Sequence, residues 1–220
     1  MAKVKLGILV SGSGTNLQAI LDATRAGALD AEVSLVISNQ PGVRALDRAK
    51  EAGVPTRVIS HRDFADRNLF DAELVEALRR AGATHVVLAG FMRVLTAVLL
   101  DAFPWRVVNI HPALLPAFPG IHAQRQALAY GVKVAGCTVH FVDGGTDTGP
   151  IIAQAVVPVL EGDTEESLST RILAEEHRLL VAVLAAIADG DVTVVPGADG
   201  SRARVQVNER AQRRFGEARL

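Results

Sequence analysis

The sequence has almost no cysteine: Cys137 is the only one among 220 residues. A single cysteine cannot form an intramolecular disulfide, and chains without paired cysteines are typical of reducing compartments. We therefore expect a cytoplasmic protein.

An excess of charge of either sign is also missing, because 23 Lys and Arg residues face 24 Asp and Glu residues and give a formal net charge of −1. Proteins that bind nucleic acid usually present a basic surface. Long hydrophobic runs are missing too. The longest clearly apolar stretch, residues 179–188, has ten residues, which is too few to span a bilayer, and the apolar run near the start is too short for a signal peptide. We expect neither a nucleic-acid partner nor a membrane partner.

Apolar residues are plentiful. They make up 49% of the chain against 21% charged residues, which suits one soluble globular domain with a sizeable core. We expect this domain to cover residues 1–196. Residues 197–220 form a tail with six arginines against one Asp and two Glu. We expect this Arg-rich tail to be a solvated, loosely attached end rather than a binding arm.

Short β-branched segments alternate with segments of helical periodicity along most of the chain. Strands are predicted at 4–10, 33–38, 56–60, 84–90 and 105–110, and helices at 16–27, 43–53 and 68–82. Such alternation predicts right-handed βαβ units and a parallel sheet covered by helices on both faces.

The pattern changes at about residue 134. Two apolar segments, 134–142 and 151–159, lie on either side of a glycine-rich loop and predict an antiparallel pair, and a long helix over 164–189 follows. The expected fold is therefore an α/β, Rossmann-like three-layer fold. Its sheet is mostly parallel, with an antiparallel extension towards the C-terminus.

A glycine-rich segment, SGSGTNL at residues 11–17, follows the first predicted strand. Ligands of open α/β sheets bind beyond the carboxyl ends of the strands. Gly12 and Gly14 permit a tight turn, and Thr15 or Asn16 can cap the next helix, whose free N–H groups suit a phosphate. The alternative is a tight turn without a ligand.

Two nucleotide-binding motifs are missing from this segment. A dinucleotide fingerprint needs a third glycine where the chain has Leu17, and an acid where Ser38 and Asn39 stand. The Lys-Ser/Thr pair of a P-loop is missing as well. A monophosphate therefore fits better than NAD or ATP.

The strand at 105–110 ends on polar side chains. Asn109 and His111 are two residues apart, so on a strand both point to the same face, and Pro112 ends the strand there. Asp143 and Asp147 stand in a glycine-rich loop that can fold over the same strand ends. These residue types suit proton transfer, although an isolated histidine is more often a core residue that is hydrogen-bonded to backbone.

Five motifs together resemble one enzyme family. They are SGSGTNLQAI, LAGFMRVL, NIHPALLPAFPGIHAQRQAL, VHFVDGGTDTGPII and EEH. In order and spacing, over about residues 4–190, they resemble the phosphoribosylglycinamide formyltransferases of de novo purine synthesis. The resemblance implies transfer of the formyl group of 10-formyltetrahydrofolate, a co-substrate, to the amine of glycinamide ribonucleotide. It implies no metal, and it leaves open whether the protein is a monomer or a homodimer.

The resemblance also implies roles for individual residues. Asn109, His111 and Asp147 would be catalytic. Contacts to the ribonucleotide and its phosphate would come from Gly14, Thr15, Asn16 and Glu176. The folate would be bound by Arg67, Met92, Arg93, Val94, Leu95, Asn109, Asp143, Gly144, Gly145, Thr146 and Asp147. His122 and His140 lie near these motifs in sequence without a definite role.

The chemistry explains why the catalytic residues are of these types. Attack of an amine on a formyl carbon creates an oxyanion, to which the Asn109 amide and a protonated His111 can donate. Asp147 is expected to raise the pKa of His111 or to hold a water molecule that relays the proton. Three alternatives compete with this function.

A methionyl-tRNA formyltransferase would need a further basic C-terminal domain, for which we expect no room in 220 residues. A formyltetrahydrofolate hydrolase would have an added N-terminal regulatory domain, whereas the first predicted strand begins by residue 4. A non-catalytic folate- or nucleotide-binding module would not need Asn109, His111 and Asp147 together.

Overall fold

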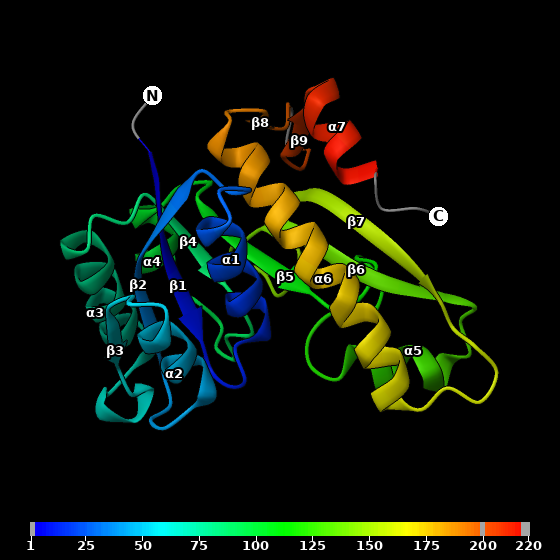
Figure 1. Cartoon of the computed structure of the whole chain (residues 1–220), viewed down its shortest axis with the longest axis horizontal. Helices are drawn as coiled ribbons and strands as arrows, with labels where there is room; N and C mark the ends of the chain where they lie inside the picture. The colour runs from blue at the N-terminus through cyan, green and yellow to red at the C-terminus, as the bar shows by residue number, and fades with distance from the viewer. Residues whose placement is uncertain (1–2, 199–200, 217–220) are drawn as a thin grey trace. The chain divides into compact units, whose positions relative to one another are not determined.

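The chain divides into two compact units, Met1–Asn109 and Ile110–Leu220 (Figure 1). The computed structural model describes residues 3–198 and 201–216. The division into a catalytic domain over 1–196 and a tail from 197 stays a prediction.

The first unit is built on parallel strands. They follow the order β3-β2-β1-β4-β5. Their bounds are Val4–Val10 for β1, Ala31–Ser38 for β2, Thr56–Val58 for β3, His85–Leu88 for β4 and Val107–His111 for β5. The last two residues of β5 belong to the second unit.

Helices flank these strands in two pairs, α1 with α2 and α3 with α4 (Figure 1). Their bounds are Thr15–Arg25 for α1, Arg44–Glu51 for α2, Arg67–Arg80 for α3 and Ala97–Ala102 for α4, with a 3-10 turn, η1, at His61–Asp63. All residues of β1 from Leu6 to Val10 are buried. Because successive side chains of a strand point to opposite faces, both faces of β1 are covered. The strand–helix alternation predicted for this part of the chain is confirmed.

The second unit contains an antiparallel strand pair, β6 (Val134–Phe141) and β7 (Ile151–Pro158). Its long helix α6 (Glu165–Ala188) packs against both strands through an apolar stripe that includes Leu168 and Ile172. The helix begins with a capping box in which Thr164 and Ser167 exchange hydrogen bonds. The predicted fold class, mostly parallel with an antiparallel pair towards the C-terminus, is confirmed.

The remaining elements of the second unit are short. They are α5 at Ala123–Tyr130, β8 at Val192–Val195, β9 at Arg204–Val207 and α7 at Glu209–Gly216. Within the residues that the structure describes, no helix is both long and apolar enough to cross a membrane.

The described part of the Arg-rich tail carries regular structure. β9 pairs with β8, and the buried carboxylate of Asp191 accepts hydrogen bonds at 2.6 and 2.7 Å from Arg210 and at 2.6 Å from Asn208. Arg214 pairs with Asp189 at 3.0 Å. These elements lie where only a loosely attached end was expected, since they are short and rich in charge. Tail residues 199–200 and 217–220 lie outside the described part of the chain.

The glycine loop departs from its predicted capping. The N-cap of α1 is Gly14, in the left-handed conformation with φ 71° and no side-chain cap, rather than Thr15 or Asn16. A Cβ on Gly14 would lie 2.6 Å from Cβ and 2.7 Å from Cα of Ala45. At Gly12 an added Cβ would meet no atom within 4 Å. Gly14 is therefore required by the fold of the loop itself.

We predict that Gly14→Ala destabilises the protein by about 1–3 kcal/mol, because alanine is strained at positive φ and its methyl group overlaps Ala45. Gly12→Ala, the matched control in the same loop, should leave the melting temperature nearly unchanged. Differential scanning calorimetry of both variants measures the difference. Equal melting temperatures for the two variants would contradict this assignment.

Candidate active site

The site is built around the end of β5. Asn109 and His111 occupy alternate positions on this strand, so their side chains leave it on the same side. Asn109 is half-buried, whereas His111 is only 4% exposed. Pro112 follows and cannot donate to a strand ladder.

Two imidazoles face the carboxylate of Asp147. His111 Nδ1 lies 3.3 Å from Asp147 Oδ2, and His140 Nε2 lies 3.7 Å from Asp147 Oδ1. The backbone N–H of Gly120 donates to Asp147 Oδ2 at 2.8 Å. The structure thus brings His111 and Asp147 together as a pair and adds His140, which the sequence left without a definite role. His140 is at the end of β6, where it is 1% exposed.

The second nitrogen of each imidazole contacts a backbone carbonyl. His111 Nε2 lies 2.9 Å from the Phe118 oxygen, and His140 Nδ1 lies 2.8 Å from the Phe141 oxygen. A carbonyl only accepts, so these nitrogens carry the protons. A neutral imidazole has one N–H, and therefore the nitrogen of His111 that faces Asp147 becomes a donor only when the ring is a cation.

The pKa of His111 differs from the sequence prediction. Burial lowers it below 6.5 and outweighs the Phe118 carbonyl and the charge of Asp147, both of which raise it. Asp147 therefore acts in the predicted direction, but the expectation of a net raised pKa was wrong. Burial also opposes the charge of Asp147. Its hydrogen bonds with His140 and the Gly120 N–H, together with the charges of the two histidines, nevertheless hold its pKa below 3.8.

The glycine-rich loop that carries Asp147 is folded by Asp143. Oδ1 of Asp143 accepts from the Gly145 N–H at 3.1 Å and from the Thr148 hydroxyl at 2.6 Å. A Cβ on Gly149 would lie 1.8 Å from the Phe141 oxygen, so only glycine fits where the loop returns to the strand. Asp147 itself has φ 53°, a conformation that Asp and Asn tolerate better than most residues.

Residues 111–118, which include His111 and the Phe118 carbonyl that contacts it, are held in place by β6. The buried hydroxyl of Thr138 donates to the Ala113 oxygen at 2.7 Å and accepts from the Leu115 N–H at 3.0 Å. Phe118, whose carbonyl contacts His111, has φ 53°. The Thr138 hydrogen bonds fix residues 113–115 from positions 23 to 25 residues away in sequence.

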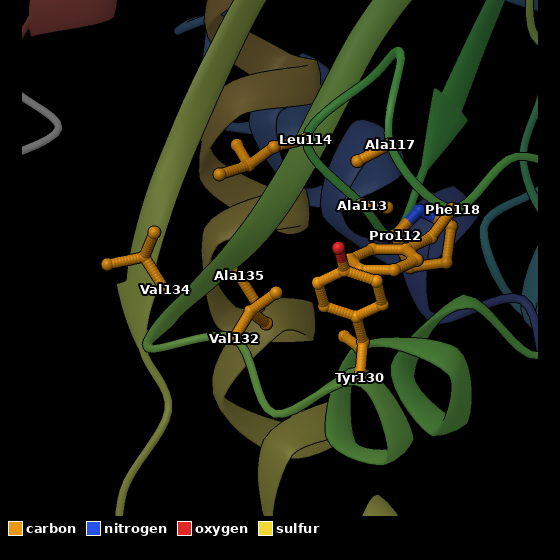
Figure 2. A pocket seen from close by; sticks show the side chains of 10 residues that line it. Pro112, Ala113, Leu114, Ala117, Phe118, Tyr130, Val132, Val134 and Ala135 are labelled. Atoms are coloured by element: carbon orange, nitrogen blue, oxygen red, sulfur yellow. The ribbon is translucent and has the colours of Figure 1, made fainter.

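An apolar cavity of about 490 Å³ lies beside this segment, and Figure 2 shows the rings of Phe118 and Tyr130 next to each other at its edge. The lining residues are Pro112, Ala113, Leu114, Ala117, Phe118, Ala127, Tyr130, Val132, Val134 and Ala135. The Tyr130 hydroxyl is the single polar side-chain group in this lining. The cavity therefore does not match a phosphorylated sugar.

The predicted phosphate loop is supported by an arginine that the sequence analysis missed. Gly14 and Asn16 are buried and Thr15 is half-buried. Arg48 of α2 donates to the Ser13 carbonyl at 2.9 Å and to Gln18 at 3.0 Å. No short-range motif marks Arg48, because its contacts join residues about 30 positions apart.

The predicted folate residues of the first unit lie on α3 and on the loop that precedes α4. Arg67 is the exposed first residue of α3. In the loop, Met92 is 69% and Val94 51% exposed, whereas Leu95 is buried. Arg93 is half-buried. Met92 and Val94 thus offer an apolar surface next to the carboxyl end of β4.

Glu175 and Glu176 are adjacent on α6 and therefore point in different directions, so their surroundings differ. Glu176 is 7% exposed, whereas Glu175 is half-buried and pairs with Arg178 at 2.9 Å. Burial, together with the charges of Glu176 and Glu175, raises the pKa of Cys137 to about 12. The Cys137 thiol is therefore protonated at neutral pH and is not a nucleophile.

Comparison with known proteins identifies the family. Residues 4–184 match the formyl transferase family model. A phosphoribosylglycinamide formyltransferase of Mycobacterium tuberculosis is 48% identical over 88% of this chain and 89% of its own length. The trifunctional purine biosynthetic protein adenosine-3 of Drosophila melanogaster is 52% identical over 87% of this chain, which spans 14% of that relative.

Solved structures agree with these matches. The crystal structure of glycinamide ribonucleotide transformylase 1 from Symbiobacterium toebii superposes with a TM-score of 0.89 at 51% identity, over 94% of this chain and 95% of that one. The family resemblance inferred from the motifs is confirmed: the chain belongs to the formyl transferase family.

Proposed function

We propose that this protein transfers the formyl group of 10-formyltetrahydrofolate to the amine of glycinamide ribonucleotide, yielding formylglycinamide ribonucleotide and tetrahydrofolate in de novo purine synthesis. The observation that carries the proposal is the distance of 3.3 Å between Asp147 and the buried His111, which lies two residues beyond Asn109 on β5. Relatives named for this reaction support it over most of the chain.

The reaction needs donors for an oxyanion and a route for one proton. The amine nitrogen attacks the formyl carbon, a C–N bond forms and the carbonyl oxygen becomes negative. The amide of Asn109 donates to this oxygen, and a His111 cation stabilises it through its positive charge, since both ring nitrogens already face other acceptors. The bond from the formyl carbon to the folate nitrogen then breaks, the attacking nitrogen loses a proton and the folate nitrogen gains one.

His111 suits this proton movement because opposing effects act on its charge. Burial disfavours the cation, whereas the Asp147 carboxylate and the Phe118 carbonyl favour it. An imidazole, whose unperturbed pKa is about 6.5, can both accept and return a proton within one turnover. Asp147 stabilises the cation by facing the nitrogen that is protonated only in that state.

The substrates would be bound by the residues that the family resemblance names. The first turn of α1, with Gly14 as its N-cap, offers N–H groups to the phosphate of the ribonucleotide, and Glu176 would contact the same substrate. A flat pterin suits the apolar side chains of Met92 and Val94. The exposed Arg67 would face the acidic side of the folate.

A formyltetrahydrofolate hydrolase is the second candidate, because the same catalytic residues can activate water in place of an amine. The discriminating experiment follows folate absorbance while the protein is mixed with 10-formyltetrahydrofolate, with and without glycinamide ribonucleotide. Formyl loss should depend on the ribonucleotide and yield its formylated product. Formate released at the same rate without the amine would favour the hydrolase, and no reaction would favour a non-catalytic binding module.

Asn109→Ala removes the amide donor to the oxyanion. We predict a loss of about 100- to 1000-fold in turnover, equal to about 3–4 kcal/mol of barrier. Substrate affinity should fall much less, since the hydrogen bond is strongest in the transition state. Steady-state kinetics with both substrates varied measures kcat and KM separately. Near-normal turnover in Asn109→Ala would remove this residue from the mechanism.

Asp147→Asn keeps the size of the side chain, tolerates the same left-handed backbone and deletes the charge. Since that charge raises the His111 pKa, we predict that the pKa falls further below 6.5 in the variant. Turnover near neutral pH should drop by about 100-fold, the scale of proton-transfer catalysis.

NMR titration of His111, with a pH–rate profile, tests this. Asp143→Asn in the same loop is the matched control. It keeps the Oδ1 acceptor for Gly145 and Thr148 that folds the loop, and should therefore leave the His111 pKa unchanged. An unchanged His111 pKa with unchanged turnover in Asp147→Asn would separate Asp147 from His111.

A further inference from the structure

The loop Phe91–Thr96, between β4 and α4, is fixed at both ends while its middle is exposed. At its start, the Met92 N–H donates to Ser11 Oγ at 2.9 Å, and the Ser11 hydroxyl donates to Asn39 at 2.6 Å. The exposed side chains of Met92 and Val94 lie between the fixed ends. A rigid frame with exposed apolar side chains is the arrangement that a preorganised binding wall requires.

The other end is held by Asp71, which is one of the most buried charged residues of the chain. Asp71 stands on α3, is 1% exposed, and accepts through Oδ2 from the Thr96 N–H at 2.6 Å and from the Thr96 hydroxyl at 2.8 Å. Thr96 is the N-cap of α4, yet its side chain makes no capping bond to that helix. Its hydroxyl is committed to Asp71 instead.

The neighbour of Asp71 on α3 supports the same loop. The ring of Phe70 stacks on Phe91, with centroids 6.5 Å apart and planes 10° from parallel. α3 therefore contacts the first residue of the loop through Phe70 and the last through Asp71. Figure 1 shows α3 and α4 as neighbours in the first unit, in agreement with their packing.

The cost of burying this carboxylate argues against a purely structural role. Asp71 Oδ1 is buried and, within the described residues, has no hydrogen-bond partner. Burial raises the pKa of Asp71, whereas Thr96 and the charges of Arg67 and Arg93 lower it. A fold that needed only packing here would be better served by an apolar residue. Arg67 and Arg93 are both among the residues predicted to bind the folate.

We infer that Asp71 is a positioning residue for the folate co-substrate: by holding Thr96 it fixes the conformation of the Phe91–Thr96 loop. This inference rests on the proposed function, because that function makes the loop a wall of the folate site. Asp71 is buried, so its effect reaches the reaction through the loop and through its charge interaction with Arg67 and Arg93.

The experiment compares steady-state kinetics of Asp71→Ala, Asp71→Asn and the surface control Glu76→Gln, which is on the same helix and pairs with Arg80. Asp71→Ala should raise the KM for 10-formyltetrahydrofolate about tenfold, or about 1.4 kcal/mol, the scale of a hydrogen bond to a charged group. The KM for glycinamide ribonucleotide should change less than about twofold, within the range of ordinary surface substitutions. Asp71→Asn keeps an acceptor for Thr96 and should restore most of the affinity.

A second pair of variants keeps the test informative if Asp71→Ala fails to fold. Thr96→Val removes the hydroxyl that donates to Asp71, whereas Thr96→Ser keeps it. Thr96→Val should weaken the folate selectively and Thr96→Ser should not. A KM for folate that is unchanged in Thr96→Val, or both KM values raised equally in Asp71→Ala, would overturn the inference.

Two readouts separate this inference from the proposed function. Calorimetric binding of tetrahydrofolate and hydrogen exchange of the amides of residues 91–96 need no turnover. If the wild type binds folate but does not formylate the ribonucleotide, the proposed function fails, while weaker folate binding and faster exchange in Thr96→Val still support Asp71. If the wild type binds no folate, both are overturned.

Discussion

A carboxylate that loses most of its hydration needs donors and positive charge around it. The arrangement of the second unit around the half-buried Asp147 follows from that constraint. The Gly120 N–H donates to Oδ2, which His111 of β5 also faces, and His140 of β6 faces Oδ1. Three parts of the chain therefore share one anion. The left-handed backbone at Asp147 and the glycine at 149 allow the loop to deliver it there.

The same constraint explains why the carboxylates of Asp147 and Asp71 differ. Asp147 has a partner for each oxygen, and its pKa lies below the ordinary value. Asp71 has donors at one oxygen and none at the other within the described residues, and its pKa lies above that value. Asp147 is also less buried than Asp71, so its greater exposure and the spread of partners over both of its oxygens favour the charged form. His111 obeys the same balance with the opposite sign.

Regular elements with a strong local pattern were predictable, the short β3 and α2 among them, whereas α4 and α5 were not. β1, β2 and α6 bury long sets of apolar residues, so the pattern of apolar residues along the chain predicts these elements. α4 has six residues and α5 eight. Isolated helices of that length are not stable in water, so such elements depend on packing that local periodicity does not encode. The strand and helix of the Arg-rich tail depend in the same way on Asp191.

The sequence by itself determined the alternation of strands and helices, the common direction of Asn109 and His111, and the motifs of the formyl transferase family, since each follows from spacing along the chain. Tertiary structure decided which acid faces His111, that His140 joins it, and that Gly14 rather than Thr15 caps α1. It also decided the sign of the His111 pKa shift. Burial and contacts between distant residues set these properties, because a charge responds to the atoms around it rather than to its neighbours in sequence.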